Sequence, residues 1–307
     1  MADDVERESE PPARYVPLTR RAERLRRVLR SAPVLLFAIV AFALDRPWLL
    51  AGSLAWGVGV IIVSRLHARA LNARLKALAG TLARDGDPFV AARSLEALVA
   101  DARAYPGFHC VALLFLGIAR ARGGDADGAL ELLYTVNRAG WLTHRTVWMA
   151  WLLPWLARLH VARGEVDLAE QWLGVARRRL PEGKRDALIE PEALIALRQG
   201  KNEEAIALID GYVTDTATDA SDPVRDHFAL LRAFACDRAG RALPEEEVRT
   251  LVAARVASPG RALPLEKWWA DFAAFVERHA PRPSTPPSSA PPPPSNTPPG
   301  DTPADLG

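Results

Sequence analysis

The chain has 307 residues, 49% of them hydrophobic, and a formal net charge of +2. This hydrophobic fraction is sufficient for a folded core, and the near-neutral charge excludes the strongly basic composition that is typical of nucleic-acid-binding proteins. Ala, Leu and Arg dominate, and no stretch alternates β-branched with polar residues. The composition therefore predicts an all-α protein. Arginine greatly outnumbers lysine, which we interpret as the coding bias of a GC-rich, bacterial genome.

The N-terminal region predicts a disordered tail followed by a membrane hairpin. Residues 1–19 are acidic and then proline-containing, as in segments that cannot form a core. In the basic segment 20–66, two apolar stretches, 33–44 and 48–63, flank the turn sequence Asp45-Arg46-Pro47. A membrane-spanning helix needs about 20 apolar residues, so each stretch must be extended by its neighbours. We predict two transmembrane helices, at roughly 28–44 and 48–66.

Charge predicts the orientation of this hairpin. Arginines are concentrated before residue 31 and after residue 64, whereas Arg46 is the only basic residue in the short loop. The positive-inside rule then places both ends in the cytoplasm, at the inner membrane of a bacterium. Gly52, Gly57 and Gly59 would let the two helices approach closely. The alternatives are a cleaved signal peptide, a single span through 48–66 with the first stretch at the interface, and a soluble buried hairpin.

No turn signal separates residue 48 from residue 83, so the second membrane helix is predicted to continue into the next domain. From there the chain repeats one phrase four times: a glycine after a helical stretch, and a small residue five positions later. The phrases start at Gly86, Gly124, Gly164 and Gly200 and end at alanines that lie 38, 40 and 36 residues apart. Such spacing predicts helix-turn-helix repeats. The alternative is an irregular all-α domain in which glycine–acid turns recur by chance.

The repeats resemble the tetratricopeptide (TPR) family. The second copy has Leu-Gly-Ile-Ala at 116–119 before its turn and Ala-Leu-Glu-Leu-Leu at 129–133 after it, and the third copy ends at Pro181. The signature positions are Ala91, Gly117, Gly124, Ala129, Gly164, Ala169, Pro181, Gly200 and Ala205. The resemblance covers roughly residues 70–255, with two good repeats, two fair ones and a doubtful one, and it implies an α-solenoid within 67–280. The pattern departs from the family where Pro88 falls inside the first turn and Pro191 inside a first helix, and where Leu243-Pro244 extends a doubtful fifth unit.

The C-terminal region combines a helix with a second tail. Leu265, Trp268, Trp269, Phe272, Phe275 and Val276 recur at helical spacing, with Pro264 at the first helical position. We interpret this stripe as the capping helix of the solenoid, and a partner-binding face is the alternative. Residues 281–307 are rich in Pro, Ser and Thr and are predicted to be disordered, with a ligand for a proline-reading domain as the alternative.

The sequence contains no recognisable catalytic or metal-binding motif. The six histidines form no metal-binding pair, and nucleophile-elbow, phosphate-loop and dinucleotide signatures are absent from the sequence. Cys110 and Cys236 are interpreted as buried free thiols. The acidic clusters at 203–204 and 245–247 suit the first turns of helices. We therefore predict no cofactor, no metal and no enzymatic activity.

The TPR resemblance also implies a binding groove along the first helices of the repeats. Its positions map to Lys76, Arg84, Leu114, Ile118, Arg122, Trp151, Arg158, Val161, Glu190, Leu194 and Arg198. The basic residues in this set favour an acidic peptide or a C-terminal carboxylate, and solvated surface arginines are the alternative. Trp151 is the predicted hot spot.

Taken together, these features predict a membrane-anchored helical-repeat scaffold that binds other proteins through a cytoplasmic solenoid. Two other hypotheses stay open at this stage. One is an enzyme, or enzyme subunit, that uses the solenoid groove. The other is a membrane-remodelling or pore-forming component that acts through its hairpin.

Overall fold

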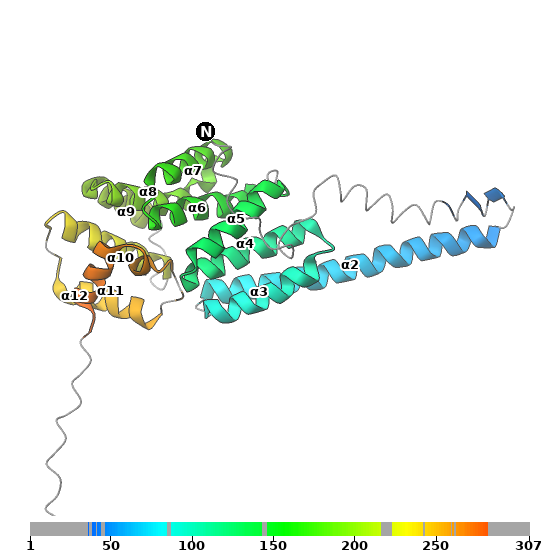
Figure 1. Ribbon diagram of the computed structural model, residues 1–307, viewed down its shortest axis with the longest axis horizontal. Coiled ribbons are helices and arrows are strands. Elements are labelled where there is room, and N and C mark those ends of the chain that lie inside the picture. Colours follow the sequence, from blue (N-terminus) through cyan, green and yellow to red (C-terminus); the bar gives the residue numbers. More distant parts are fainter. Residues whose placement is uncertain are drawn as a thin grey trace, which may run out of the picture.

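The structure is a computed structural model that describes residues 36, 39–40, 42–43, 47–84, 87–142, 146–215, 223–241, 243–258, 260 and 262–281. Within these residues all regular secondary structure is helical, as the composition predicts (Figure 1). The long helices are α2 (Pro47–Arg84), α3 (Pro88–Ala102), α4 (Pro106–Gly123), α5 (Ala126–Ala139), α6 (Thr146–Ala162), α7 (Val166–Arg179), α8 (Ile189–Arg198), α9 (Asn202–Asp215), α10 (Pro223–Arg238), α11 (Glu245–Ala257) and α12 (Ala270–His279). Two 3-10 segments, η3 (Glu182–Leu188) and η4 (Leu265–Lys267), precede α8 and α12.

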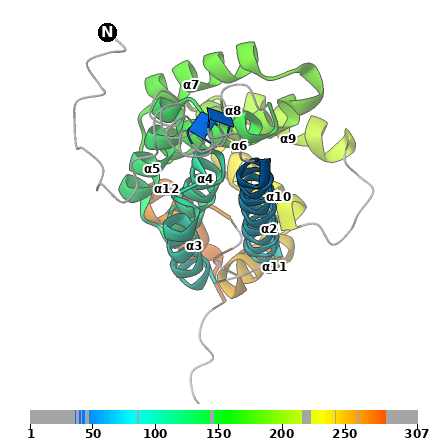
Figure 2. The same ribbon diagram turned by 90° about the vertical axis from the view of Figure 1, so that its right-hand side faces the viewer.

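Helix α2 is one uninterrupted element of 38 residues that crosses the predicted domain boundary at residue 66. The predicted continuity is therefore confirmed. Its first half projects from the body of the protein (Figures 1 and 2). Val60, Ile61, Ile62 and Val63 are 48–66% exposed. Because four consecutive residues of a helix point to all its sides, this half has no side packed on the body.

The second half of α2 begins the packed body. Leu71, Leu75 and Leu82 are buried, and α2 packs on α3 and α4. Most helices that follow pack on their neighbours in the chain, and α2, α4, α6 and α8 also make contacts from each helix to the next in that series. Helix α4 lies at the centre of this arrangement: every residue from His109 to Ala119 is buried.

Three of the four repeated glycine phrases, and Gly240 of the doubtful fifth unit, share one turn geometry, whereas Gly86 of the first phrase lies outside the described residues. Gly124, Gly164, Gly200 and Gly240 follow α4, α6, α8 and α10 with φ of 92°, 84°, 76° and 71°. After each glycine the next amide donates a hydrogen bond to the carbonyl five residues earlier, at 2.8–2.9 Å. This left-handed cap satisfies carbonyls that the helix end leaves unpaired. Ala129, Ala169 and Ala205, five residues after three of these glycines, are fully buried.

Replacing Gly164 by alanine is expected to lower the free energy of unfolding by about 1–2 kcal/mol, because an L-residue is strained at positive φ. No atom lies within 4 Å of the added Cβ, so the backbone conformation alone causes the effect. Gly183→Ala is the matched control, since its Cβ also meets open space but its φ is not positive. Chemical denaturation of both variants tests this, and equal stabilities would contradict it.

The two prolines that interrupt the repeat pattern, Pro88 and Pro191, both lie in the first turn of a helix. Pro88 does not lie inside the inter-helix turn of the first repeat: it is the first residue of α3, and the Asp87 carboxylate caps that helix by accepting from the Phe89 amide at 2.8 Å. A proline suits this position because its missing N–H would be unpaired there anyway. The second proline is expected to make its helix either start late or kink. Pro191 is the third residue of α8, which follows η3, so the structure shows the late start.

The C-terminal aromatic stripe is broken rather than continuous. It forms η4 and α12, and Trp269 between them has extended backbone angles of −131° and 101°. Trp269, Phe272 and Phe275 are buried around Phe234 of α10, with ring centroids 5.1–5.4 Å from it. The stripe is therefore part of the core.

Burial of Cys110 and Cys236 as free thiols is confirmed, and the acidic clusters occupy the first turns of α9 and α11 as predicted.

Several predictions fall on residues that the structure does not describe. They are the tails at 1–19 and 282–307, the arginines at 20–30, the loop at 45–46 and most of the first apolar stretch. In that stretch the positions described are 36, 39, 40, 42 and 43, which are helical and exposed. In the described part of the chain, one helical stretch, Leu54–Leu82, is long and apolar enough to cross a membrane by length and composition.

Candidate functional site

Four of the predicted groove residues are core residues, and one of them is Val161 on α6, which is fully buried. The other three, Leu114 and Ile118 on α4 and Leu194 on α8, are 0–1% exposed. The cause is that α4, α6 and α8 are packed among several neighbouring helices, so the apolar positions implied by the TPR register are covered. They are not part of a surface that a partner could contact.

The predicted basic residues on α4 and α8 bind the protein's own backbone. Arg122 donates to the carbonyl of Leu82 near the end of α2. Arg198 donates to the carbonyls of Val161 and Ala162 at the end of α6, at 3.1 and 2.6 Å. Each of these arginines therefore satisfies the carbonyl end of another helix, where the macrodipole is negative. Their charges stabilise the fold, in contrast to the prediction that they receive an acidic peptide.

Arg198 also holds the C-terminal segment in place. Its guanidinium lies 4.0 Å from the ring centroid of Trp269 and donates to the Trp268 carbonyl at 3.3 Å. Nearby, Lys267 of η4 donates to the Gly123 carbonyl at the end of α4, at 2.9 Å. Residues 267–269 therefore lie across the ends of α4, α6 and α8.

A row of nearly buried titratable side chains connects three alternate helices. Arg158 of α6 contacts Glu190 of α8 at 2.7 Å, and Glu190 accepts from His227 of α10 at 3.1 Å. The three side chains are only 17%, 13% and 10% exposed. Burial raises the pKa of Glu190, but the attraction of Arg158, the hydrogen bond from His227 and the more distant charge of Arg122 outweigh it and bring that pKa to about 2. The carboxylate is therefore ionised at all physiological pH values.

Trp151 marks the surface next to this row. Trp151, Trp155 and Arg158 share one face of α6, since they are four and three residues apart. Trp151 is 43% exposed, and its ring centroid lies 6.0 Å from that of Phe115 on α4. Below it, Trp155 is buried, and the Arg158 guanidinium lies 5.2 Å from its ring. The structure thus brings Trp151, Arg158 and Glu190 into one region, and the TPR register predicted all three.

The remaining predicted groove residues lie apart from this region. Lys76 is exposed on α2, and the side chain of Arg84 lies outside the described part of the structure.

Sequence reasoning missed His227 because no local motif marks it. The only signal in the sequence is spacing: His227 follows Glu190 by 37 residues, which is close to the 36–40 residues between the repeated alanines.

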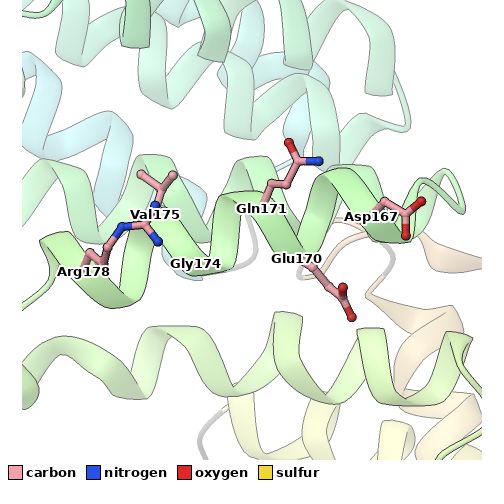
Figure 3. Close-up of a pocket in the computed structure, with 6 residues that line it drawn as sticks. All are labelled: Asp167, Glu170, Gln171, Gly174, Val175 and Arg178. Carbon is pink, nitrogen blue, oxygen red and sulfur yellow. The ribbon is translucent and has the colours of Figure 1, made fainter. Parts of the chain in front are cut away.

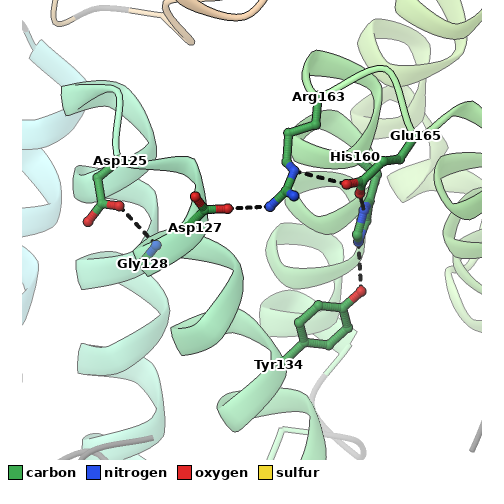
Figure 4. A network of polar contacts seen from close by, with 7 residues as sticks. All are labelled: Asp125, Asp127, Gly128, Tyr134, His160, Arg163 and Glu165. Atoms are coloured by element: carbon green, nitrogen blue, oxygen red, sulfur yellow. Dashed lines mark hydrogen bonds and ion pairs between the residues drawn. The ribbon is translucent and has the colours of Figure 1, made fainter. Parts of the chain in front are cut away.

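A second polar network joins α5 to the turn between α6 and α7 (Figure 4). His160 lies between the Tyr134 hydroxyl at 2.7 Å and the Glu165 carboxylate at 2.6 Å. Arg163 contacts Glu165 at 3.0 Å and also pairs with Asp127. His160 is buried, so its ring is not accessible to a substrate, and we interpret this network as a structural clip between helices.

The buried His160 predicts a pH dependence of stability. Burial lowers the pKa of His160, and this outweighs the opposing effect of Glu165. The unfolded chain then binds a proton that the folded chain does not, so stability is complete above about pH 6.5 and falls as the pH drops below that value. His160→Gln should reduce the fall in unfolding free energy between pH 7 and pH 5, measured by denaturant titration. Equal falls in the variant and the wild type would contradict this.

The described part of the structure has a hollow of about 580 Å³ between α11 and the C-terminal end of α12, where Glu245, Arg249 and Arg278 are among the lining residues. A depression of about 620 Å³ runs along α7 (Figure 3), but all six residues that line it come from that one helix, so it is an outer face rather than an enclosed pocket. A small cavity of about 30 Å³ lies between α10 and α11, large enough for little more than a water molecule. Within the described residues, no three metal-ligating side chains form a group that could hold an ion.

Known proteins give no further guide to the site. No family model, no curated protein and no solved structure matches the chain.

Proposed function

We propose that this protein is a membrane-anchored scaffold that binds other proteins through a TPR-like array of helical hairpins. One observation carries the proposal: α2 is apolar in its first half, where the large apolar side chains that the structure describes are 48–70% exposed, and it is packed into the helical body in its second half. In water, a bare apolar helix exposes a large hydrophobic area, and burial in a bilayer removes that cost. The same helix then serves as membrane anchor and as first helix of the array.

The solenoid part of the proposal is supported by the recurrence of one turn. The same left-handed glycine cap ends α4, α6, α8 and α10, and the helices between these caps form successive contacts. Such hairpin units stack so that each buries the apolar face of the next. We also propose that a second transmembrane helix precedes α2, because the arginine distribution favours a hairpin with both ends of the chain in the cytoplasm of a bacterium.

The proposed binding surface is centred on Trp151. An exposed tryptophan on a rigid helix provides a large apolar contact at a small entropic cost, which is typical of binding hot spots. Val147, one turn earlier on the same helix, is 59% exposed and extends this surface. Because Arg158 is paired with Glu190, the contact we propose is apolar and aromatic rather than an acidic-peptide clamp.

Photocrosslinking in cells tests the adaptor function. A benzoyl-phenylalanine would replace Trp151, and a matched control would replace Val224, which is similarly exposed on α10. We expect discrete crosslinked adducts from position 151 in the membrane fraction and none at the same mass from position 224. Identical adducts from both positions, or none from position 151, would contradict the proposal.

A further inference from the structure

We propose that the turn between α3 and α4, residues 103–107, lies at the membrane surface and contacts anionic lipid headgroups. The inference rests on the proposed membrane anchoring of α2 and adds a specific contact between the helical body and lipid. Its basis is the distance along α2 between the end of the apolar stretch and the start of the packed body.

The apolar part of α2 is just long enough to cross a bilayer. Residues 47–64 carry no charged side chain, whereas Arg65, Arg69, Arg74 and Lys76 follow within the next three turns. At 1.5 Å per residue this stretch is about 27 Å long, against a hydrocarbon core of about 30 Å. The uncharged stretch therefore lies entirely within the hydrocarbon core, and Arg65 lies at its boundary.

The body of the protein begins almost immediately after that boundary. The His67 ring stacks on Tyr105, which precedes α4, with centroids 5.3 Å apart and planes 25° apart. From residue 64 to residue 67 the helix rises only about 5 Å. The headgroup layer on one side of a bilayer is about 5–8 Å thick. Because α2 continues here without a break, the α3–α4 turn has to lie within the headgroup layer.

The residues at this end have the chemistry of a lipid-facing surface. Arg65 and Arg69 on α2 and Arg103 at the turn are exposed. Tyr105 is only partly buried, as in the aromatic belts of membrane proteins. The nearby carboxylate of Asp101 is paired with Arg74 at 2.6 Å, which reduces its repulsion of an anionic surface. Clustered arginines next to a membrane helix favour anionic lipids.

The geometry is visible in two views. Figure 1 shows α2 extending from one end of the body, and Figure 2 views the molecule from that end, with α3 and α4 beside α2. In this orientation the viewer of Figure 2 stands on the membrane side of the body.

The test measures the depth of the turn in vesicles that hold the full-length protein. Gly107→Cys places a fluorescent label in the first turn of α4, and Gly183→Cys places it in η3, which packs on α6, α7 and α8. An added Cβ meets no atom within 4 Å at either position. The native thiols are buried, and burial raises the pKa of Cys110 to about 12, so neither native thiol competes for the label.

Nitroxide-labelled phosphatidylglycerol should quench the label at 107 at least about twofold more strongly than the label at 183, and more strongly than nitroxide-labelled phosphatidylcholine does. Arg69→Gln with Arg103→Gln should remove the difference between the two lipids. Equal quenching at both positions in protein that floats with the vesicles would overturn the inference and leave the anchor intact. Equal quenching by both lipids at position 107 would overturn the anionic preference. Failure to float would overturn the membrane anchor itself.

Discussion

Replacing Glu190 by glutamine is expected to lower the free energy of unfolding by about 3–5 kcal/mol, the usual cost of removing one partner of a buried ion pair. The variant keeps the shape of the side chain but leaves Arg158, which is only 17% exposed, without its counter-charge. It also removes the carboxylate that accepts from His227. Because these residues come from α6, α8 and α10, the effect should weaken the contacts among the three helices together. Denaturant titration followed by tryptophan fluorescence measures it.

The contribution of the Glu190 carboxylate to the free energy of unfolding should depend on pH. The pKa of Glu190 is about 2 in the folded protein and 4.5 for the reference group. A lowered acid pKa contributes stability that is present above about pH 4.5 and is lost as the pH falls towards 2. The wild type should therefore lose more stability than Glu190→Gln over this interval.

Two controls separate this effect from general perturbation. Glu245→Gln breaks an exposed pair with Arg249, which should cost at most about 1 kcal/mol. Combining Glu190→Gln with Arg158→Met removes the charge left uncompensated by the single change and should recover much of the loss. If Glu190→Gln lowers the free energy of unfolding no more than Glu245→Gln does, the proposed stabilising role of the Arg158–Glu190 contact is wrong.

The second large effect concerns membrane insertion. Leu54→Arg combined with Val58→Arg places two charges, one helical turn apart, in the middle of the apolar half of α2. Each arginine near a bilayer centre costs about 2.5–3.5 kcal/mol on insertion scales. The double variant should therefore move from the membrane fraction to the soluble or aggregated fraction, measured by flotation of cell lysate on a density gradient.

Leu66→Arg is the matched control for that variant. Leu66 is also on α2 and 56% exposed, but it lies beyond the uncharged stretch and next to Arg65. A charge at this level can reach the headgroups, so the control should float like the wild type. Equal flotation of the Leu54/Val58 variant and the control would show that the apolar half of α2 does not cross the bilayer.

Features that depend on local sequence were predictable. The continuity of α2 follows from the lack of a turn signal between residues 48 and 83, and the glycine caps at 124, 164 and 200 follow from glycine's tolerance of positive φ. Each depends on residues that are close in the chain. Local rules also predicted that the helix containing Pro191 either starts late or kinks, and α8 starts only two residues before it.

Features that depend on tertiary packing were not predictable in the same way. The TPR register put Leu114 and Leu194 on a groove, but neighbouring helices cover them. The arginines at 122 and 198 looked like ligand-binding residues because the sequence does not reveal which carbonyl ends lie within reach. The aromatic stripe had helical periodicity, yet Trp269 is extended because its ring packs against Phe234 and Arg198.

The most direct test of the central claim, that α2 anchors a helical array in a membrane, is alkaline carbonate extraction of membranes that contain the full-length chain. Carbonate releases proteins held at the surface by charge, and leaves behind those whose apolar segment lies in the bilayer. We expect the protein to stay in the membrane pellet because the bare apolar half of α2 is continuous with the packed body. Release into the supernatant would contradict the anchor, and with it the proposed position of the body at the membrane surface.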